Sequence, residues 1–123
     1  MKTAIIVMSD PKGGEEATGR VFNALAAAYD FKQRKHEVTI LFQGAGTRWI
    51  GELEKADHPA HGLFDQVRGE IAGISCGCAD VFGGTEEAES CGVNVLKDNA
   101  VPGTSGLASL AVLAEEGYTT LTF

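Results

Sequence analysis

Short apolar runs alternate with longer segments of helical periodicity from one end of the chain to the other. Residues 3–8 form the first run, and its continuity is typical of a strand that is covered on both faces of a sheet. After a Gly-rich turn, residues 15–34 predict a helix whose apolar face is made by Val21, Phe22, Leu25, Ala28 and Tyr29. Residues 38–42 form the second strand. Together these segments predict a right-handed β-α-β unit with parallel strands.

Shorter elements are predicted in the middle of the chain. Residues 48–55 indicate a short helix that turns Trp49, Ile50 and Leu53 inward. This helix ends before Pro59, because the residue that precedes a proline avoids helical geometry. A second short helix is predicted from Pro59 to Arg68, and residues 71–75 form the third strand.

The third strand leads into two further helical segments. A short helix is expected to begin at Cys76-Gly77-Cys78 and to continue through Phe82. Thr85 is expected to cap another helical turn, because its hydroxyl can accept a hydrogen bond from the backbone of the first turn. Residues 93–96 then form the fourth strand.

The last part of the chain completes an α/β pattern. Ser105 is predicted to cap a final helix that runs to Glu116, and residues 118–123 form a fifth strand whose threonines favour an edge position. Five mainly parallel strands with helices between them predict one α/β domain over residues 1–123. Its fold class is a Rossmann-like, three-layer α/β/α sandwich. The order of the strands does not follow from this pattern.

Length and composition agree with one folded domain. Hydrophobic residues make up 44% and charged residues 22% of the 123-residue chain, which is ordinary for a globular protein. No apolar run approaches the roughly 20 residues that a membrane helix needs. The start of the chain briefly resembles a signal peptide, but its apolar stretch is too short, and residues 9–12 interrupt it before any cleavage site could follow. We therefore expect a soluble, cytoplasmic protein.

The charge balance excludes two classes of partner. Asp and Glu number 17 against 10 Lys and Arg, so the formal net charge is −7. A nucleic acid requires a basic face that displaces its counterions, and an anionic membrane surface attracts basic segments for a similar reason. We expect neither a nucleic acid nor a membrane as a partner.

The most reactive site is predicted at Cys76 and Cys78, the candidate catalytic residues. The chain has three cysteines, two of them separated by one residue, which suits a reactive site in a reducing compartment better than structural disulfides. Cys76 falls at the carboxyl end of the third strand, where reactive groups collect in parallel sheets. The thiolate is the reactive form of cysteine and is favoured at the positive end of a helix dipole, whereas Asp80 would oppose it unless it faces away. In the alternative interpretation both cysteines are small buried hydrophobes.

Other uses of the cysteines match the pattern less well. Cys91 precedes Gly92-Val93 and is interpreted as a buried structural thiol. A zinc site could combine the cysteines with His58 or His61, but a one-residue cysteine spacing is not that of zinc sites. A disulfide between Cys76 and Cys78 would close a strained loop. We expect no metal and no cofactor.

One glycine motif could bind an anion. Gly44-Ala45-Gly46-Thr47-Arg48 follows the second strand and offers backbone N–H groups and a cation, but it does not continue as a dinucleotide-binding fingerprint. Glycines at the start of a helix are the preferred interpretation. Trp49, just after this motif, is interpreted as an anchor of the core or of a subunit interface.

Three features together resemble the DsrE/DsrF-like family of small sulfur-relay proteins. The strand over residues 71–75 ends in a cysteine, and a short helix over residues 78–83 leads to Gly92-Val93. The segment from Ser105 to Phe123 resembles the final helix and strand of the family. The resemblance covers nearly the whole chain and implies a Rossmann-like sandwich that assembles as a homo-oligomer or with sister subunits.

The resemblance also implies a function. In sulfur-relay members a cysteine after the third or fourth strand receives sulfur as a persulfide and passes it to the cysteine of a partner. By its place at the end of the strand, Cys76 matches that residue, and Cys78 matches a second cysteine of some relatives. We therefore expect a persulfide carrier or sulfurtransferase subunit with donor and acceptor proteins as partners. The alternatives are a non-catalytic module that binds a small molecule or nucleotide, and an oligomeric partner protein whose cysteines are merely packed.

Overall fold

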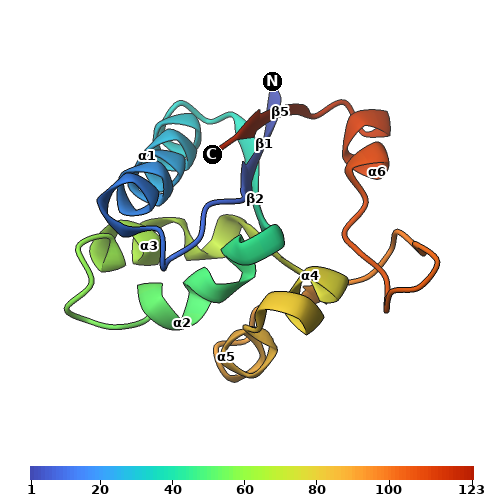
Figure 1. The fold of residues 1–123 in the computed structure, drawn as a ribbon. Coiled ribbons are helices and arrows are strands. Elements are labelled where there is room, and N and C mark those ends of the chain that lie inside the picture. Colours follow the sequence, from blue (N-terminus) through green and yellow to red (C-terminus); the bar gives the residue numbers. More distant parts are fainter.

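The computed structural model describes residues 1–123, which form one five-stranded sheet flanked by helices (Figure 1). The strands are β1 (Lys2–Val7), β2 (Glu37–Phe42), β3 (Ile71–Ser75), β4 (Val95–Leu96) and β5 (Thr119–Thr122). The helices are α1 (Gly14–Gln33), α2 (Trp49–Leu53), α3 (His61–Val67), α4 (Cys76–Phe82), α5 (Thr85–Ser90) and α6 (Leu110–Glu115). The chain also forms two 3₁₀ turns, η1 (Gly44–Arg48) and η2 (Arg68–Glu70). None of the helices combines the length and apolar character that a membrane span requires.

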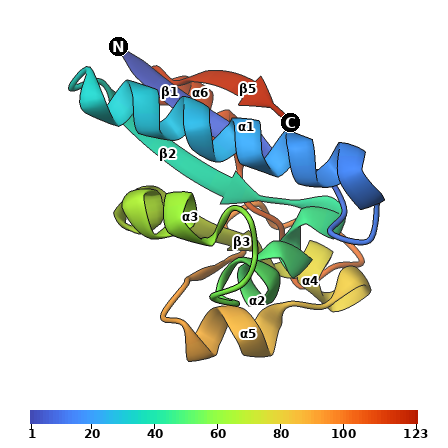
Figure 2. The ribbon, with the colours of Figure 1, turned by 90° about the vertical axis from the view of Figure 1, so that its left-hand side faces the viewer.

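All neighbouring strands are parallel, in the order β4-β3-β2-β1-β5. The chain adds β2, β3 and β4 in turn on one side of β1 and then returns to place β5 on the other side. Figure 1 shows α1 and α6 on opposite sides of β1 and β2, and Figure 2 shows α1 and α3 on the same face of the sheet. The predicted three-layer α/β/α sandwich is therefore confirmed. Its layers are unequal, because one face carries several helices and the other carries only α6 and the segment that leads to it.

The buried core is divided unequally between the two faces of the sheet. On the α1 face, 19 buried residues form one cluster that includes Ile5, Val7, Ile40, Phe42 and Trp49. On the α6 face the buried cluster contains only Ala4, Ile6, Leu41 and Ala108. Successive residues of a strand point to opposite faces, so β1 contributes to both clusters. Because β1 is buried on both faces, residues 4–7 are all apolar, and the start of the chain is a continuous apolar run.

Helix α1 packs on the sheet through a narrower stripe than the sequence predicts. Its buried residues are Ala17, Val21, Ala24, Leu25 and Ala28. Phe22 and Tyr29 are 43% and 37% exposed, so the prediction that they face the core is wrong. Each of them follows a buried residue by one position and is therefore rotated by about 100° away from the sheet. Small alanines let the helix lie close to the strands, and the two rings stay on its flank.

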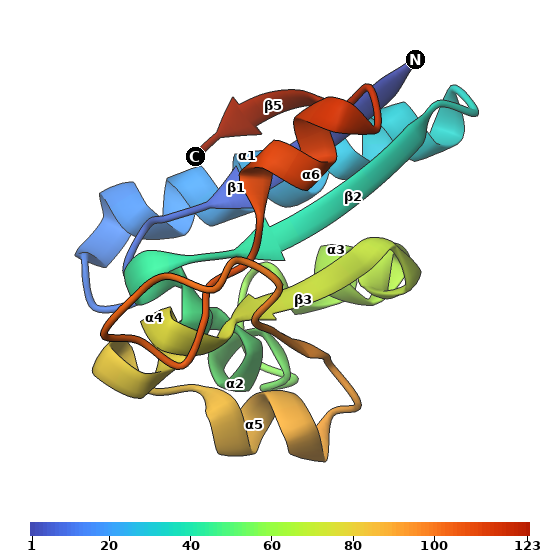
Figure 3. The ribbon, with the colours of Figure 1, turned by 90° about the vertical axis from the view of Figure 1, so that its right-hand side faces the viewer.

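The final helix begins later than predicted. Ser109 is its N-cap, and the Ser109 Oγ atom accepts a hydrogen bond from the Val112 N–H at 3.1 Å. Ser105 is not a cap, because the residues before α6 form a loop that is closed by a bridge between Asn99 and Leu107. This loop lies across α4 in Figure 3. The Ser105 side chain is therefore free to contact a different group.

Thr85 does not cap α5 either. The N-cap is Gly84, which has a φ of 110° and lies against η1 so closely that an added Cβ would be 2.1 Å from the Thr47 carbonyl oxygen. Only glycine tolerates both the left-handed backbone and the close approach. Thr85 therefore becomes the first residue inside the helix.

Other boundaries differ from the predictions by a few residues. The helix predicted over residues 48–55 is α2, which ends at Leu53, and the helix predicted from Pro59 begins at His61 as α3. The strand predicted over residues 93–96 shortens to β4, because this edge strand pairs with β3 at only two positions. The fifth strand lies at the other edge of the sheet and is exposed along its length, as its threonines predict.

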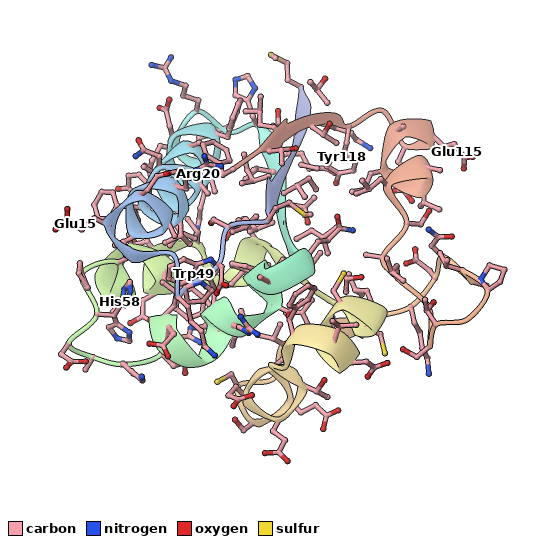
Figure 4. The ribbon with its side chains drawn as sticks, in the orientation of Figure 1. Glu15, Arg20, Trp49, His58, Glu115 and Tyr118 are labelled. Carbon is pink, nitrogen blue, oxygen red and sulfur yellow. The ribbon has the colours of Figure 1, made fainter.

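The exposed strand β5 is anchored where it begins. Tyr118, which is labelled in Figure 4, donates a hydrogen bond from its hydroxyl to the carboxylate of Glu37, the first residue of β2. The Lys2 Nζ atom lies 5.2 Å from the centre of the Tyr118 ring. Lys2 also pairs with Glu37 at 3.8 Å. The hydrogen bond to Glu37 is the main reason that the pKa of Tyr118 rises to about 12, because the ionised phenol would lose it.

We predict that replacing Tyr118 with phenylalanine lowers the free energy of unfolding by about 1 kcal/mol near neutral pH, the usual net value of one hydrogen bond. The ordinary pKa of 10.0 is raised to about 12 in the folded protein, so this contribution is complete below pH 10 and is lost as the pH rises through 12. Urea unfolding of both proteins near neutral pH and near pH 12 checks this. A stability difference that stays constant with pH would contradict it.

Candidate functional site

The carboxyl end of β3 passes directly into α4. Ser75 is the last residue of the strand and Cys76 is the first residue of the helix, so the predicted position of Cys76 at this junction is confirmed. Pairing between β2 and β3 shifts by one residue in the middle of β3. A shift of this kind re-aims the residues that follow it and is common beside functional sites. The direct connection between β3 and α4, together with this shift in pairing, sets the position of the Cys76 thiol.

Cys76 and Cys78 lie on different faces of α4. Residues two apart in a helix are separated by about 200°, and only those three or four apart are neighbours. Cys76 thus shares a face with Asp80, whereas Cys78 shares a face with Val81 and Phe82. All three cysteines of the chain are free, and both of these are half-buried. A helix at this position sets the two thiols apart and disfavours the disulfide between them.

The Cys76 thiol contacts a side chain that sequence reasoning misses. The Cys76 Sγ atom lies 3.2 Å from the Ser105 Oγ atom, and Ser105 donates a hydrogen bond to the Asp80 Oδ2 atom at 2.5 Å. Because the single hydroxyl proton of Ser105 points to Asp80, the Ser105 oxygen is left to accept the hydrogen bond of the Cys76 thiol. Asp80 therefore does not face away from Cys76, but reaches it through Ser105.

Two hydrogen bonds donated by backbone N–H groups hold Ser105 over the thiol. The Gly77 N–H donates to the Gly106 carbonyl at 2.7 Å, and the Ala108 N–H donates to the Ser75 Oγ atom at 3.1 Å. Gly77 is also required for space, because an added Cβ would lie 2.7 Å from the Leu107 Cδ1 atom. The small residue between the cysteines thus lets the loop before α6 lie against the start of α4.

The turn after β2, η1, binds the carboxyl end of α4 through hydrogen bonds from two of its side chains. The Arg48 Nε atom donates to the Phe82 carbonyl at 2.6 Å, and the Arg48 guanidinium pairs with Asp10 at 3.2 Å. Hydrogen bonds from the Lys12 backbone N–H and from Arg48 lower the pKa of Asp10. The Thr47 Oγ1 atom donates to the Gly83 carbonyl at 2.8 Å. The cation of the conceivable anion site is therefore already paired inside the protein, and Gly44 begins a helical turn as the preferred interpretation expects.

The third cysteine belongs to a different environment. Cys91 follows α5 and packs, half-buried, against the main core, in agreement with its interpretation as a structural thiol. Burial raises the pKa of the Cys91 thiol, and a hydrogen bond with Glu54 raises it further. Both effects disfavour the thiolate and make Cys91 a poor nucleophile.

The histidines of the conceivable zinc site are used elsewhere. His58 packs edge-on against Trp49 with ring centres 6.0 Å apart, and the His61 Nδ1 atom lies 2.7 Å from the Leu53 carbonyl oxygen. No group of three or more His, Cys, Asp or Glu side chains is arranged to hold a metal ion. Trp49 is 1% exposed and donates to the Ser9 carbonyl at 2.8 Å, so it anchors the core as interpreted.

Comparison with known proteins agrees with this architecture. The model of the DsrE/DsrF-like family matches residues 1–123. The chain belongs to the DsrE/DsrF-like family. Membership confirms the resemblance seen in the sequence and indicates a role related to sulfur relay with partner proteins.

The fold of this DsrE/DsrF-like protein is also found in a solved structure. A conserved protein of unknown function from Bacteroides thetaiotaomicron is similar with a TM-score of 0.65 and 20% sequence identity, over 99% of this chain and 94% of the other. At that identity the likeness concerns the fold alone. Among curated proteins, none matches this chain significantly.

We predict that Gly77→Ala destabilises the DsrE/DsrF-like protein by about 1–3 kcal/mol, because the new methyl group would overlap Leu107 and displace the loop that carries Ser105. The matched control is Gly62→Ala in α3, where an added Cβ meets nothing within 4 Å. Alanine in that exposed helix position is expected to be neutral or stabilising. Denaturant unfolding of both variants checks this, and equal stabilities would show that the contact at Gly77 is unimportant.

Proposed function

We propose that this protein is a persulfide carrier, or the sulfur-carrying subunit of a sulfurtransferase, in an intracellular sulfur relay. The observation that carries the proposal is the half-buried Cys76 thiol at the β3–α4 junction, linked to Asp80 through Ser105. Sulfur relay needs an accessible thiol, a way to handle its proton and a protein surface around it, and it needs no metal. The three free thiols suit the reducing cytoplasm, where we place the reaction.

The chemistry is thiol exchange at a sulfane sulfur. The Cys76 thiolate attacks the outer sulfur of a donor persulfide, a new S–S bond forms at Cys76, and the S–S bond of the donor breaks. The donor leaves as a thiolate and is protonated, so a persulfide and a thiol become a thiol and a persulfide. Transfer to an acceptor runs the same exchange with Cys76 as the leaving thiol. No electrons are gained or lost overall.

Ser105 and Asp80 are proposed to move the proton of this exchange. As Cys76 loses its proton to Ser105, Ser105 passes its own proton to Asp80, so that no charge is stranded on the hydroxyl. The protonated Asp80 returns the proton by the same path when a thiolate leaves. Groups positioned within hydrogen-bond distance of the transferred proton are those that act in general acid–base catalysis.

Cys78 is proposed as an accessory thiol. It shares the outer face of α4 with Val81 and Phe82, which are 74% and 38% exposed. From that face it can meet a sulfur that approaches on a partner, while Cys76 holds the sulfur beside Ser105. The alternative of a non-catalytic binding module gains no support, because its anion-binding candidate Arg48 is engaged by Asp10 and Phe82.

We also propose that the protein works as a homo-oligomer, as its family resemblance implies. The α6 face of the sheet has the smaller core, and Leu110 and Val112 remain about two-fifths exposed on α6 (42% and 38%). Burying such apolar side chains against a second copy is favourable. The α4 site lies apart from these residues and would stay open to partners.

Cys76→Ser is expected to abolish sulfur loading, and Cys78→Ser to reduce it, because only Cys76 contacts the proton-handling pair. Cys91→Ser is the matched control and should load normally, since Cys91 is held in the core with a raised pKa. Mass spectrometry after incubation with inorganic polysulfide locates the added sulfur atom. If the added sulfur is found only on Cys91, the assignment is wrong.

Ser105→Ala is expected to slow loading of Cys76 by roughly 10²-fold, the lower end of the range for positioned proton-transfer groups. Ser109→Ala is the matched control: it removes the N-cap of α6, at about 1 kcal/mol of stability, without touching Cys76. Ser105→Thr keeps the hydroxyl and should restore most of the rate. Single-turnover loading kinetics measure all three, and equal rates for Ser105→Ala and Ser109→Ala would refute a role in proton transfer.

A further inference from the structure

The outer face of α4 exposes apolar side chains beside a thiol. Val81 is 74% exposed and Phe82 is 38% exposed, although both belong to a helix whose other residues pack against η1 and the loop before α6. Cys78 lies on the same helical face as both. Exposed apolar groups that surround a reactive residue indicate a surface which is covered during function.

Carboxylates lie beside this apolar surface, because Phe82 of α4 and Glu87 of α5 line the same hollow. Helix α5, next to α4, carries Glu86, Glu87 and Glu89, and none of the three forms an ion pair within the chain. Together with Asp80 they give four carboxylates, and no Lys or Arg occurs between Arg68 and Lys97. An open hollow of about 430 Å³ separates the two helices, with Asp80, Glu86 and Glu87 among the residues that line it.

The cations nearest to this surface, Lys12 and Arg48, form no ion pair with the carboxylates of α5. Lys12 and Arg48 line a neighbouring hollow together with Phe82 and Glu87. Arg48 is already paired with Asp10 at 3.2 Å. The carboxylates of α5 therefore remain available to a cationic partner.

We propose that the α4–α5 face, formed by Cys78, Val81, Phe82, Glu86, Glu87 and Glu89, docks a partner protein whose cysteine lies in an apolar contact bordered by lysines or arginines. This inference rests on the proposed function, because that partner would be the donor or the acceptor of the sulfur. Val81 and Phe82 are the apolar contacts, and the carboxylates attract and orient the partner.

The negative charge of α5 favours a basic partner over a second copy of the chain at this face. In a two-fold dimer the same patch meets itself, so the carboxylates of α5 would face their own copies. Like charges brought together in an interface oppose association. The homo-oligomer proposed above therefore uses a different surface, and the α4–α5 face is left for a basic partner.

Two thiol-reactive peptides test this face. Both contain one cysteine beside a leucine, activated as a 2-pyridyl disulfide, and they differ only in four flanking residues, which are lysines in one and glutamates in the other. A protein thiolate attacks the peptide sulfur, a mixed disulfide forms and pyridine-2-thione leaves, so absorbance follows the reaction. The protein carries Cys91→Ser in every case, which restricts the reaction to Cys76 and Cys78.

At low ionic strength the lysine peptide is expected to react about tenfold or more faster than the glutamate peptide. Salt near 1 M should remove most of this ratio by screening. Glu86→Gln, Glu87→Gln and Glu89→Gln together should lower the ratio severalfold at low salt. The control triple variant Glu15→Gln, Glu115→Gln and Glu116→Gln removes the same charge far from α5, as Figure 4 shows for Glu15 and Glu115, and should keep the ratio.

Equal rates for the two peptides, or the same loss of preference in both triple variants, would overturn the docking proposal. Loading of Cys76 by inorganic polysulfide is measured separately on the same proteins. Normal loading without a preference for the lysine peptide means that the docking surface is wrong and the function stands. A clear preference without any loading means that the function is wrong and the acidic surface stands.

Discussion

The candidate site depends on one hydrogen bond between distant parts of the chain, from the Gly77 N–H to the Gly106 carbonyl. It joins the first turn of α4 to the loop before α6, and the contact between Ala108 and Ser75 lies beside it. Gly106 can accept this role because its φ of 104° turns the loop where a Cβ would meet Lys97. Without this link the loop would not bring Ser105 into contact with the Cys76 thiol.

The unequal layers of the sandwich leave surfaces for other proteins. The α1 face holds a core of 19 buried residues, whereas the α6 face holds only 4. The large core therefore supports the fold, and the thin layer carries the loop that completes the site. A short helix and a loop on the α6 face bring exposed apolar side chains to the surface, as expected of a protein that works with partners.

The helical geometry of α4 gives its two thiols different surroundings. Cys76 meets the polar pair Ser105 and Asp80, whereas Cys78 lies on the face of Val81 and Phe82. In a strand, two residues separated by one position point to the same face. In a helix, the same two residues point in nearly opposite directions. The separation is therefore a consequence of starting the helix at Cys76, and it puts Cys76 on the polar face and Cys78 on the apolar face of α4.

Local patterns were sufficient to predict much of this protein. Short apolar runs predicted β1, β2 and β3, helical periodicity predicted α1, and the end of β3 placed Cys76 correctly, because these features depend on neighbours in sequence. Phe22 and Tyr29 were misplaced, since the rotation of α1 is set by how closely its alanines pack on the sheet. The prediction of Ser105 as a helix cap was also wrong, because the loop that contains it is shaped by the bridge between Asn99 and Leu107.

By itself the sequence determined the fold class, the family and the strand end that bears Cys76, because each follows from local periodicity or from the order of short motifs. The strand order, the inequality of the layers and the contact of Ser105 with Cys76 were decided only by the tertiary structure. Ser105 is 29 residues from Cys76. A loop closed over that distance is positioned by packing and hydrogen bonds that no local pattern of side chains encodes.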